Sequence, residues 1–117
     1  MSGKKCLRGA LVALSMLSAG GACAAPLKLI GFGDMSCRAW IASKDDAEQR
    51  GQYVAWVRGV LTGHNYANQS RQVSDISSST VDNYVTRYCV QNPQGSFSDA
   101  ALRMSDQFSG RNAAITK

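Results

Sequence analysis

Two cysteines, Cys37 and Cys89, limit most strongly what this chain can fold into, because they remain when the N-terminal segment is removed as a leader. That segment has a basic start, an apolar run at residues 11–17 and a small-residue motif at residues 22–24. This order is the signature of a secretory signal peptide. We therefore predict that residues 1–24 are a signal peptide and that cleavage follows Ala24.

Removing the leader also changes the cysteine count. Cys6 leaves with it, and so does Cys23, unless Cys23 is lipidated as the first residue of a lipoprotein. Gly20 stands where a lipoprotein motif has leucine, so the lipidated form is not favoured. In an exported protein the two remaining cysteines are expected to form one disulfide, Cys37–Cys89. A loop of this length contributes roughly 4 kcal/mol in the chain-entropy model. Neither cysteine has a second cysteine or a histidine cluster nearby, so no metal site is predicted.

The charge balance also depends on the leader. The full chain has 13 Lys and Arg against 8 Asp and Glu, and three of the basic residues lie in the leader. The mature chain would therefore carry a net charge of +2, without a run of Lys or Arg, and nucleic-acid binding is not predicted. The leader is shorter than the roughly 20 apolar residues of a membrane-spanning helix, so no stable membrane insertion is expected after cleavage. The predicted location is periplasmic or secreted.

Helical periodicity dominates the rest of the sequence. Residues 25–44 read as an extended arm followed by a short helical turn at residues 37–41. A long helix is then expected to end near Ala67, with Ser43 or Asp45 as its N-cap and Glu48 completing a capping box. Its large apolar residues recur at helical spacing, at Tyr53, Val54, Val57, Val60 and Leu61.

Two shorter helices are predicted after a polar surface loop at residues 68–79. The first would be capped by Ser79 or Thr80 and would stop before Pro93. The second would begin at Ser96, with Asp99 completing a capping box, and would end at Gly110. Together these elements predict an all-α fold, a small three- to four-helix domain with one disulfide. The disulfide-stapled helical domain is placed at residues 45–110 and a flexible tail at residues 111–117.

Two glycines in the long helix, Gly59 and Gly63, lie on one ridge that Ala55 and Ala67 continue at four-residue steps. Each glycine costs about 1 kcal/mol of helix propensity relative to alanine, so a packing or binding reason is expected. Core packing against another helix or a tryptophan is the favoured interpretation. The alternative is a partner-binding groove made of Trp56, Gly59, Gly63 and His64.

His64 is the single histidine of the chain and is predicted to lie near the middle of the apolar stripe. A lone histidine on such a face is usually a core group with satisfied hydrogen bonds, and catalysis would need a nucleophile or an orienting acid. Asp75 and Asp82 are the nearest carboxylates in sequence, but the sequence does not place them. No catalytic residue and no cofactor are therefore predicted, although a pH-sensing role fits the titration range of histidine.

The order of these features resembles a known pattern. An exported leader, a cysteine followed by Trp40, and the segments YVAWVRGVLTGHN, YVTRYCVQNP and FSDAALRM follow one another. Over about residues 37–109 the chain resembles the HdeA/HdeB acid-stress chaperones and the Tai-type immunity proteins of type VI secretion. The resemblance implies a compact helical fold and a binding protein without catalytic residues. It matches Cys37 and Cys89 as the disulfide, and Gly59, Gly63 and Pro93 as structural positions.

The predicted function is accordingly that of an exported, non-enzymatic protein that binds another protein, as an immunity protein or inhibitor does. The alternative is an HdeA-like periplasmic chaperone of acid stress, in which carboxylates lose their charge at low pH and free a buried dimer interface. The expected partner is a toxin in the first case and an unfolded client in the second, and a homodimer is compatible with either. A small hydrolase is the third hypothesis, but no serine lies in a G-x-S-x-G motif.

Overall fold

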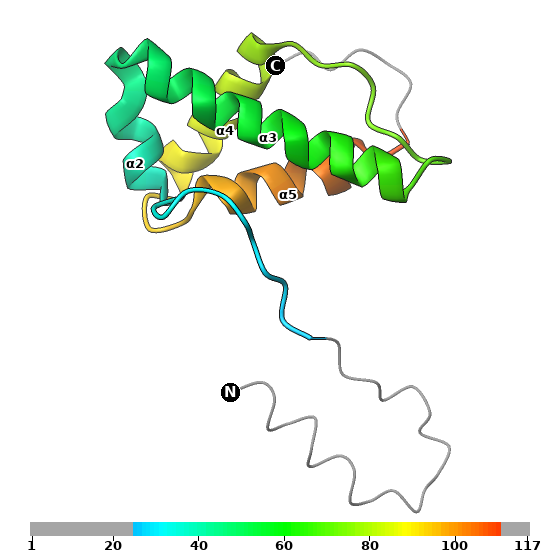
Figure 1. Ribbon diagram of the computed structural model, residues 1–117. Helices are drawn as coiled ribbons and strands as arrows, with labels where there is room; N and C mark the ends of the chain where they lie inside the picture. Colours follow the sequence, from blue (N-terminus) through cyan, green and yellow to red (C-terminus); the bar gives the residue numbers. More distant parts are fainter. Residues whose placement is uncertain (1–24, 111–117) are drawn as a thin grey trace, which may run out of the picture.

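A computed structural model describes residues 25–110 of the chain. Within this range four α-helices form and no strand does (Figure 1). The helices, labelled as in Figure 1, are α2 (Cys37–Ala42), α3 (Ala47–Ala67), α4 (Ser78–Gln91) and α5 (Phe97–Phe108), with a short 3-10 turn, η2 (Ser43–Asp45), before α3. The predicted all-α fold is thereby confirmed. The predicted signal peptide at residues 1–24 and tail at residues 111–117 lie outside the described residues.

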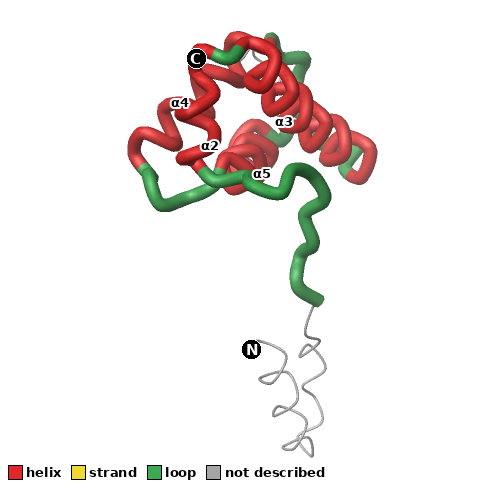
Figure 2. The backbone as a smooth tube through the Cα atoms, turned by 60° about the vertical axis from the view of Figure 1, so that its left-hand side comes forward, coloured by secondary structure: helices red, strands yellow, loops and turns green. Residues whose placement is uncertain are grey.

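The helix α3 organises the fold. It packs against α4 and α5, which also pack against each other, while α2 contacts α4. In Figure 1, α3 runs the length of the helical unit and α2 stands at one end of it. Ahead of α2 the chain is an extended loop that leads away from the helices (Figure 2). We call residues 25–31 of this loop the arm.

Each helix begins at a polar residue whose side chain accepts a hydrogen bond from a backbone N–H three residues later. This N-cap satisfies one of the N–H groups that have no partner within the helix. The four N-caps are Ser36, Asp46, Ser77 and Ser96. At α5 the Oγ of Ser96 accepts from the N–H of Asp99 at 3.1 Å, so the predicted start of this helix is confirmed.

The predicted N-caps of the other two long helices are wrong by one to three positions. Ser43 and Asp45 form η2, and Asp46 caps α3 because its carboxylate accepts from the N–H of Gln49 at 3.0 Å. Ser77 caps α4 and takes the N–H of Thr80 at 3.1 Å. Both stretches contain several adjacent capping residues, and the fold selects the one whose backbone is extended.

The disulfide joins Cys37 at the start of α2 to Cys89 near the end of α4, with the two Cα atoms 5.1 Å apart. Both cysteines are 1% exposed. The predicted pairing is confirmed. The bond holds α2 against the end of α4. From α2 the chain continues directly through η2 into α3.

Aromatic rings form the centre of the core. Phe97, at the first position of α5, is fully buried, and its ring centroid lies 4.6 Å from that of Tyr53 and 5.5 Å from that of Trp40. The rings of Phe32 and Trp56 also lie against it, at 6.4 and 5.9 Å. Because Trp40 comes from α2 and Phe32 from the loop before it, residues ahead of α3 contribute to the same core as the three longer helices.

The loop between α3 and α4 is only partly the polar surface segment that its composition predicts. Val73 and Ile76 are buried, with 5% and 8% of their surface exposed. Asn65 on α3 holds Val73 in place, because its side chain accepts from the Val73 N–H at 2.8 Å and donates to the Val73 carbonyl at 3.0 Å. The prediction was wrong for these two residues because one backbone-binding asparagine side chain turns the loop inward.

Candidate functional site

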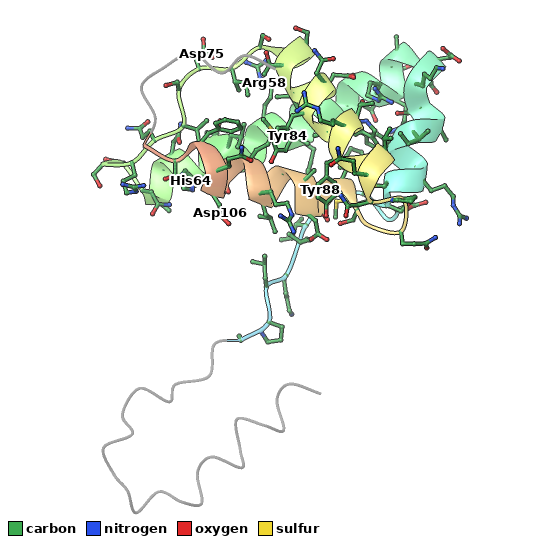
Figure 3. The ribbon with its side chains drawn as sticks, turned by 180° about the vertical axis from the view of Figure 1, so that it is seen from behind. Arg58, His64, Asp75, Tyr84, Tyr88 and Asp106 are labelled. Carbon is green, nitrogen blue, oxygen red and sulfur yellow. A yellow bond between two sulfur atoms is a disulfide. The ribbon has the colours of Figure 1, made fainter. Side chains whose placement is uncertain are left out.

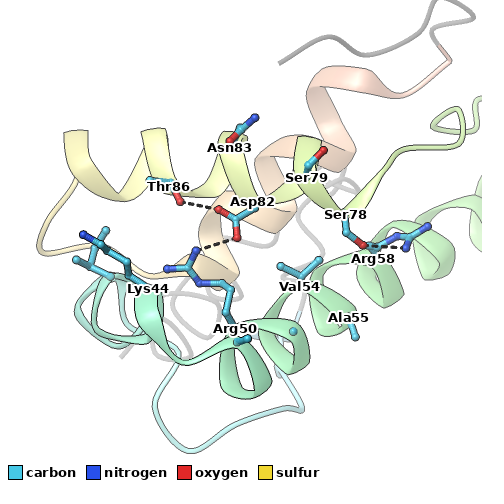
Figure 4. A pocket seen from close by; sticks show the side chains of 13 residues that line it. Lys44, Arg50, Val54, Ala55, Arg58, Ser78, Ser79, Asp82, Asn83 and Thr86 are labelled. Carbon is cyan, nitrogen blue, oxygen red and sulfur yellow. Dashed lines mark hydrogen bonds and ion pairs between the residues drawn. The ribbon is translucent and has the colours of Figure 1, made fainter.

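A groove of about 780 Å³ lies between α3 and the first half of α4 (Figure 4). The α3 wall consists of Ala47, Arg50, Gly51, Val54, Ala55 and Arg58, and the α4 wall consists of Ser78, Ser79, Asp82, Asn83 and Thr86. Ile41 and Lys44 close the end next to α2. We call this cavity the α3–α4 groove. Its volume is in the range of small-molecule sites in proteins.

An ion pair crosses the α3–α4 groove. The Nη1 of Arg50 donates to the Oδ2 of Asp82 at 2.8 Å, and the two side chains are 14% and 33% exposed. Arg50 also donates to the Ser43 Oγ at 2.8 Å and to the Trp40 carbonyl at 2.6 Å, and its guanidinium lies 4.3 Å from the centroid of the Trp40 ring. Such a guanidinium is held in one position, since each of its three nitrogens donates a hydrogen bond and its flat face lies on a ring.

The network continues through Thr86. Its Oγ accepts from the indole Nε1 of Trp40 at 2.9 Å and donates to the Oδ1 of Asp82 at 3.3 Å. Asp82 on α4 therefore holds together three elements, because Trp40 lies on α2 and Arg50 on α3.

The other two cations of the groove lie toward its two ends, as Figure 4 shows for Lys44 and Arg58. Both are exposed, and Arg58 donates to the Ser78 Oγ at 3.3 Å. Asp82 is the one acidic residue of the lining, and it is already paired with Arg50. The groove therefore has an apolar floor and an excess of positive charge at its rim.

The four-residue pattern of small residues that includes Gly59 and Gly63 extends toward the N-terminus of the long helix, into this site. Alanine or glycine recurs at every fourth position from Ala47 through Gly51 to Ala55. Arg50 and Arg58 flank Val54 at the same four-residue step, so they lie on one side of the helix. Neither pattern alone identifies the opposite wall, which comes from α4.

Two residues of the predicted partner groove, Trp56 and Gly59, lie in a second cleft. Trp56 and Gly59 line a cleft of about 460 Å³ with Leu27, Leu29 and Ile30 of the arm, whereas Gly63 and His64 are not part of it. The indole Nε1 of Trp56 donates to the Ile30 carbonyl at 2.9 Å. Leu27 and Ile30 are 69% and 87% exposed. The arm thus presents apolar side chains to solvent beside this cleft.

Core packing, the favoured interpretation of the two glycines, is wrong. A Cβ atom built on Gly59 or on Gly63 meets nothing within 4 Å, and both residues are exposed. The buried side chains of α3 are Tyr53, Val54, Val57 and Leu61, which lie on another face of the helix. A glycine that contacts the core is found instead in the arm, where a Cβ on Gly31 would lie 2.6 Å from the Trp56 Nε1.

His64 lies at the end of α3 beside the end of α5, outside the buried stripe (Figure 3). Its Nε2 is 3.0 Å from the Ser109 Oγ and 3.2 Å from the Arg71 carbonyl. The prediction that His64 lies in the middle of the apolar stripe was therefore wrong, because the last buried residue of α3 is Leu61. Neutral partners surround its ring nitrogens, and Asp82 is bound to Arg50 instead.

Two titratable groups have altered acidity. Partial burial raises the pKa of Tyr84 above its ordinary value, and its hydroxyl donates to the Gln107 Oε1 at 2.8 Å. Hydrogen bonds from the Ser36 side chain and backbone lower the pKa of Asp34. Asp34 therefore stabilises the start of α2 above its ordinary pKa, and this contribution disappears as the pH falls through the lowered value.

Residues 25–110 contain no group of three or more His, Cys, Asp or Glu side chains that could hold a metal ion. In the same range, no helix combines the length and the apolar character that crossing a membrane requires.

Replacing Gly59 with alanine is expected to raise the free energy of unfolding by about 1 kcal/mol, because the new methyl group meets open space and alanine has the higher helix propensity. Gly31→Ala is the contrasting variant and is expected to destabilise the protein, since the methyl group would collide with the Trp56 indole. Urea unfolding followed by circular dichroism measures both. A destabilising effect of Gly59→Ala would mean that another surface covers this face in solution.

A family model supplies the relationship of the chain to known proteins. The HdeA/HdeB family matches residues 9–99, which is most of the chain and includes both cysteines and the helices α2, α3 and α4. Neither the curated proteins nor the solved structures contain a significant match. The match gives no separate support to the resemblance to Tai-type immunity proteins. A leader-like N-terminus, a disulfide-stapled four-helix unit and a match over most of its length show that the chain belongs to the HdeA/HdeB family.

Proposed function

We propose that this protein is a periplasmic chaperone of acid stress, which binds unfolded proteins at low pH and catalyses no reaction. Membership of the HdeA/HdeB family is the observation that carries this proposal. It places the chaperone alternative ahead of the immunity-like function that the sequence favoured. A disulfide is compatible with an oxidising compartment such as the periplasm.

The charge distribution supports acid activation. After cleavage at Ala24 the chain would carry all eight Asp and Glu against ten Lys and Arg, a net charge of +2. The two charges nearly balance at neutral pH. When acid neutralises the carboxylates, the cations repel one another without compensation, and a compact state of this size loosens.

The Arg50–Asp82 network suggests that the contact between α3 and α4 is the part of the fold that loosens. The ion pair joins α3 to α4, and loss of either partner would leave the other charge without its ionic partner at a partly buried site. The disulfide between α2 and α4 is unaffected by acid, so those two helices stay joined. We infer that acid separates α3 from α4 and exposes Val54 and its buried neighbours to a client.

The direct test mixes the mature protein with an enzyme that unfolds and aggregates in acid, and follows light scattering at about pH 2.5 and at pH 7. The chaperone should suppress aggregation at the lower pH alone. Fluorescence of an apolar dye and analytical ultracentrifugation should show exposed apolar surface and any change in oligomeric state over the same range. Unchanged aggregation at both pH values would rule out the proposal.

Asp82→Asn is expected to move the onset of client binding to a higher pH, because asparagine keeps the shape and lacks the charge. It should also lower the free energy of unfolding at pH 7 by about 1 kcal/mol, the magnitude for an ion pair that is neither fully exposed nor fully buried. Asp106→Asn is the matched control, since Asp106 is an exposed residue on α5, away from the groove (Figure 3). If the two variants begin to bind the client at the same pH, the Arg50–Asp82 network does not contribute to acid activation.

Immunity-like binding remains a separate prediction. It would require a tight complex with one protein at neutral pH, where the chaperone is expected to be inactive. The open face around Gly59 and Gly63 is available to such a partner. Capture of a single stoichiometric partner at pH 7, combined with no chaperone activity in acid, would favour it.

A further inference from the structure

We propose that the α3–α4 groove binds a free fatty acid, with the carboxylate at Arg58 and the apolar chain lying along α3 toward Ile41. This inference goes beyond the proposed chaperone function and does not depend on it. It rests on the cavity itself and on the arrangement of charge around it.

The floor of the groove suits an unbranched hydrocarbon chain. Ala47, Gly51 and Ala55 succeed one another along α3, and a Cβ on Gly51 would meet nothing within 4 Å. Small side chains leave room along α3, where Val54 supplies apolar surface, and a bound chain would pass over the Arg50–Asp82 ion pair that crosses the groove. From Ala47 to Arg58 the channel measures about 16 Å at the rise of an α-helix, which suits an extended chain of medium length.

The charges of the rim favour an anion. Asp82 forms an ion pair with Arg50. The Arg50 guanidinium also donates to Ser43 and to the Trp40 carbonyl, and its flat face lies on the Trp40 ring. Lys44 and Arg58 then remain as positive charges that the lining does not offset. An amphiphile with one negative head group complements this rim, whereas a neutral one of the same length leaves both cations without an opposite charge.

Arg58 is the better place for the head group. One of its nitrogens is bound to the Ser78 Oγ, and a guanidinium has further donors that can bind a carboxylate at two points. Ser78 and Ser79, the neighbouring residues on the opposite wall, form the first turn of α4, where backbone N–H groups add positive potential. Lys44, at the other end, adjoins the exposed Ile41, and its methylene stem can cover the end of the chain.

The size of the groove favours a free fatty acid over a phospholipid. About 780 Å³, open along one side, accommodates one hydrocarbon chain and its head group, and a diacyl lipid would leave its second chain in water.

The test uses the full-length mature protein and dodecanoate below its micellar concentration, at pH 7, where the carboxylate is charged. Isothermal titration calorimetry should show one site per chain. Dodecanol, which has the same chain and no charge, should bind up to about fivefold more weakly, the effect of losing one exposed ion pair. Equal affinity for both ligands, or no binding of dodecanoate, overturns the proposal.

Substitutions locate the site. Gly51→Leu should abolish binding by filling the channel, and Gly63→Leu, an exposed glycine of the same helix outside the groove, should leave it unchanged. Circular dichroism confirms that both variants are folded. Arg58→Gln should weaken dodecanoate binding about fivefold and Lys44→Gln less. Undiminished binding by Gly51→Leu, or a larger effect of Lys44→Gln, contradicts the site as described.

A final experiment distinguishes a free fatty acid from a membrane lipid as the ligand. Sedimentation with vesicles of anionic phospholipid should recover no more protein than sedimentation with neutral vesicles. Recovery on anionic vesicles without binding of dodecanoate would identify a membrane surface as the partner and would overturn the proposal.

Discussion

Removal of the disulfide is expected to lower the free energy of unfolding by about 4 kcal/mol, because the bond between Cys37 and Cys89 closes a loop over much of the folded chain. Small domains have a total stability of roughly 5–15 kcal/mol, so this loss removes a large part of it. The variant to use is the double substitution Cys37→Ala and Cys89→Ala. Both positions are buried, and alanine introduces no polar group there.

Urea unfolding of this variant should be compared with that of the oxidised protein and of the protein reduced by a thiol. The variant and the reduced protein should unfold at similar urea concentrations, well below that of the oxidised form. A difference under about 1 kcal/mol would mean that helix packing alone holds α2 against α4 and that the loop-closure argument does not apply here. The same pair of samples would show whether acid activation requires the bond.

Phe97→Ala is expected to cost about 3–5 kcal/mol, the range for truncating a fully buried phenylalanine. The Phe97 ring contacts four rings from three parts of the chain: Phe32 ahead of α2, Trp40 on α2, and Tyr53 and Trp56 on α3. Its loss would leave a cavity where these parts meet. The neighbouring rings cannot all move to fill it, since they are fixed to three different segments.

Thermal and urea unfolding measure this effect, and two further variants serve as controls. Phe97→Leu keeps most of the apolar volume and should cost much less than alanine. Phe108→Ala removes a ring from the other end of α5, where Phe108 is only partly buried and packs edge-on against Tyr84. A cost of Phe97→Ala no greater than that of Phe108→Ala would show that the aromatic cluster is not the centre of the core.

The structure also assigns the contacts between helices to other residues of α3 than those that the sequence singled out. The sequence drew attention to Gly59, Gly63 and His64 because glycine is costly in a helix and the histidine is single. The residues that meet across two helices are instead Arg50 and Asp82, which are ordinary surface types separated by 32 positions. Trp56, predicted as part of a partner groove, donates to the Ile30 carbonyl of the arm.

The local features of this protein could be predicted from its residues alone. Helical periodicity and the Ser96–Asp99 cap act within one or two turns, so they can be read without a partner. The pairing of Cys37 with Cys89 followed from counting, since the predicted removal of residues 1–24 would leave only these two cysteines.

Which helix faces are covered depends instead on how the helices pack. A ridge of small residues fits a packed interface as well as an open face, and helix packing left Gly59 exposed while it buried Val54. The inward turn of Val73 and the meeting of Arg50 with Asp82 depend on how α3 lies against the loop and α4. The physical reason is range: hydrogen bonds within a helix join residues four apart, whereas burial and ion pairing depend on segments that come together only when the whole core forms.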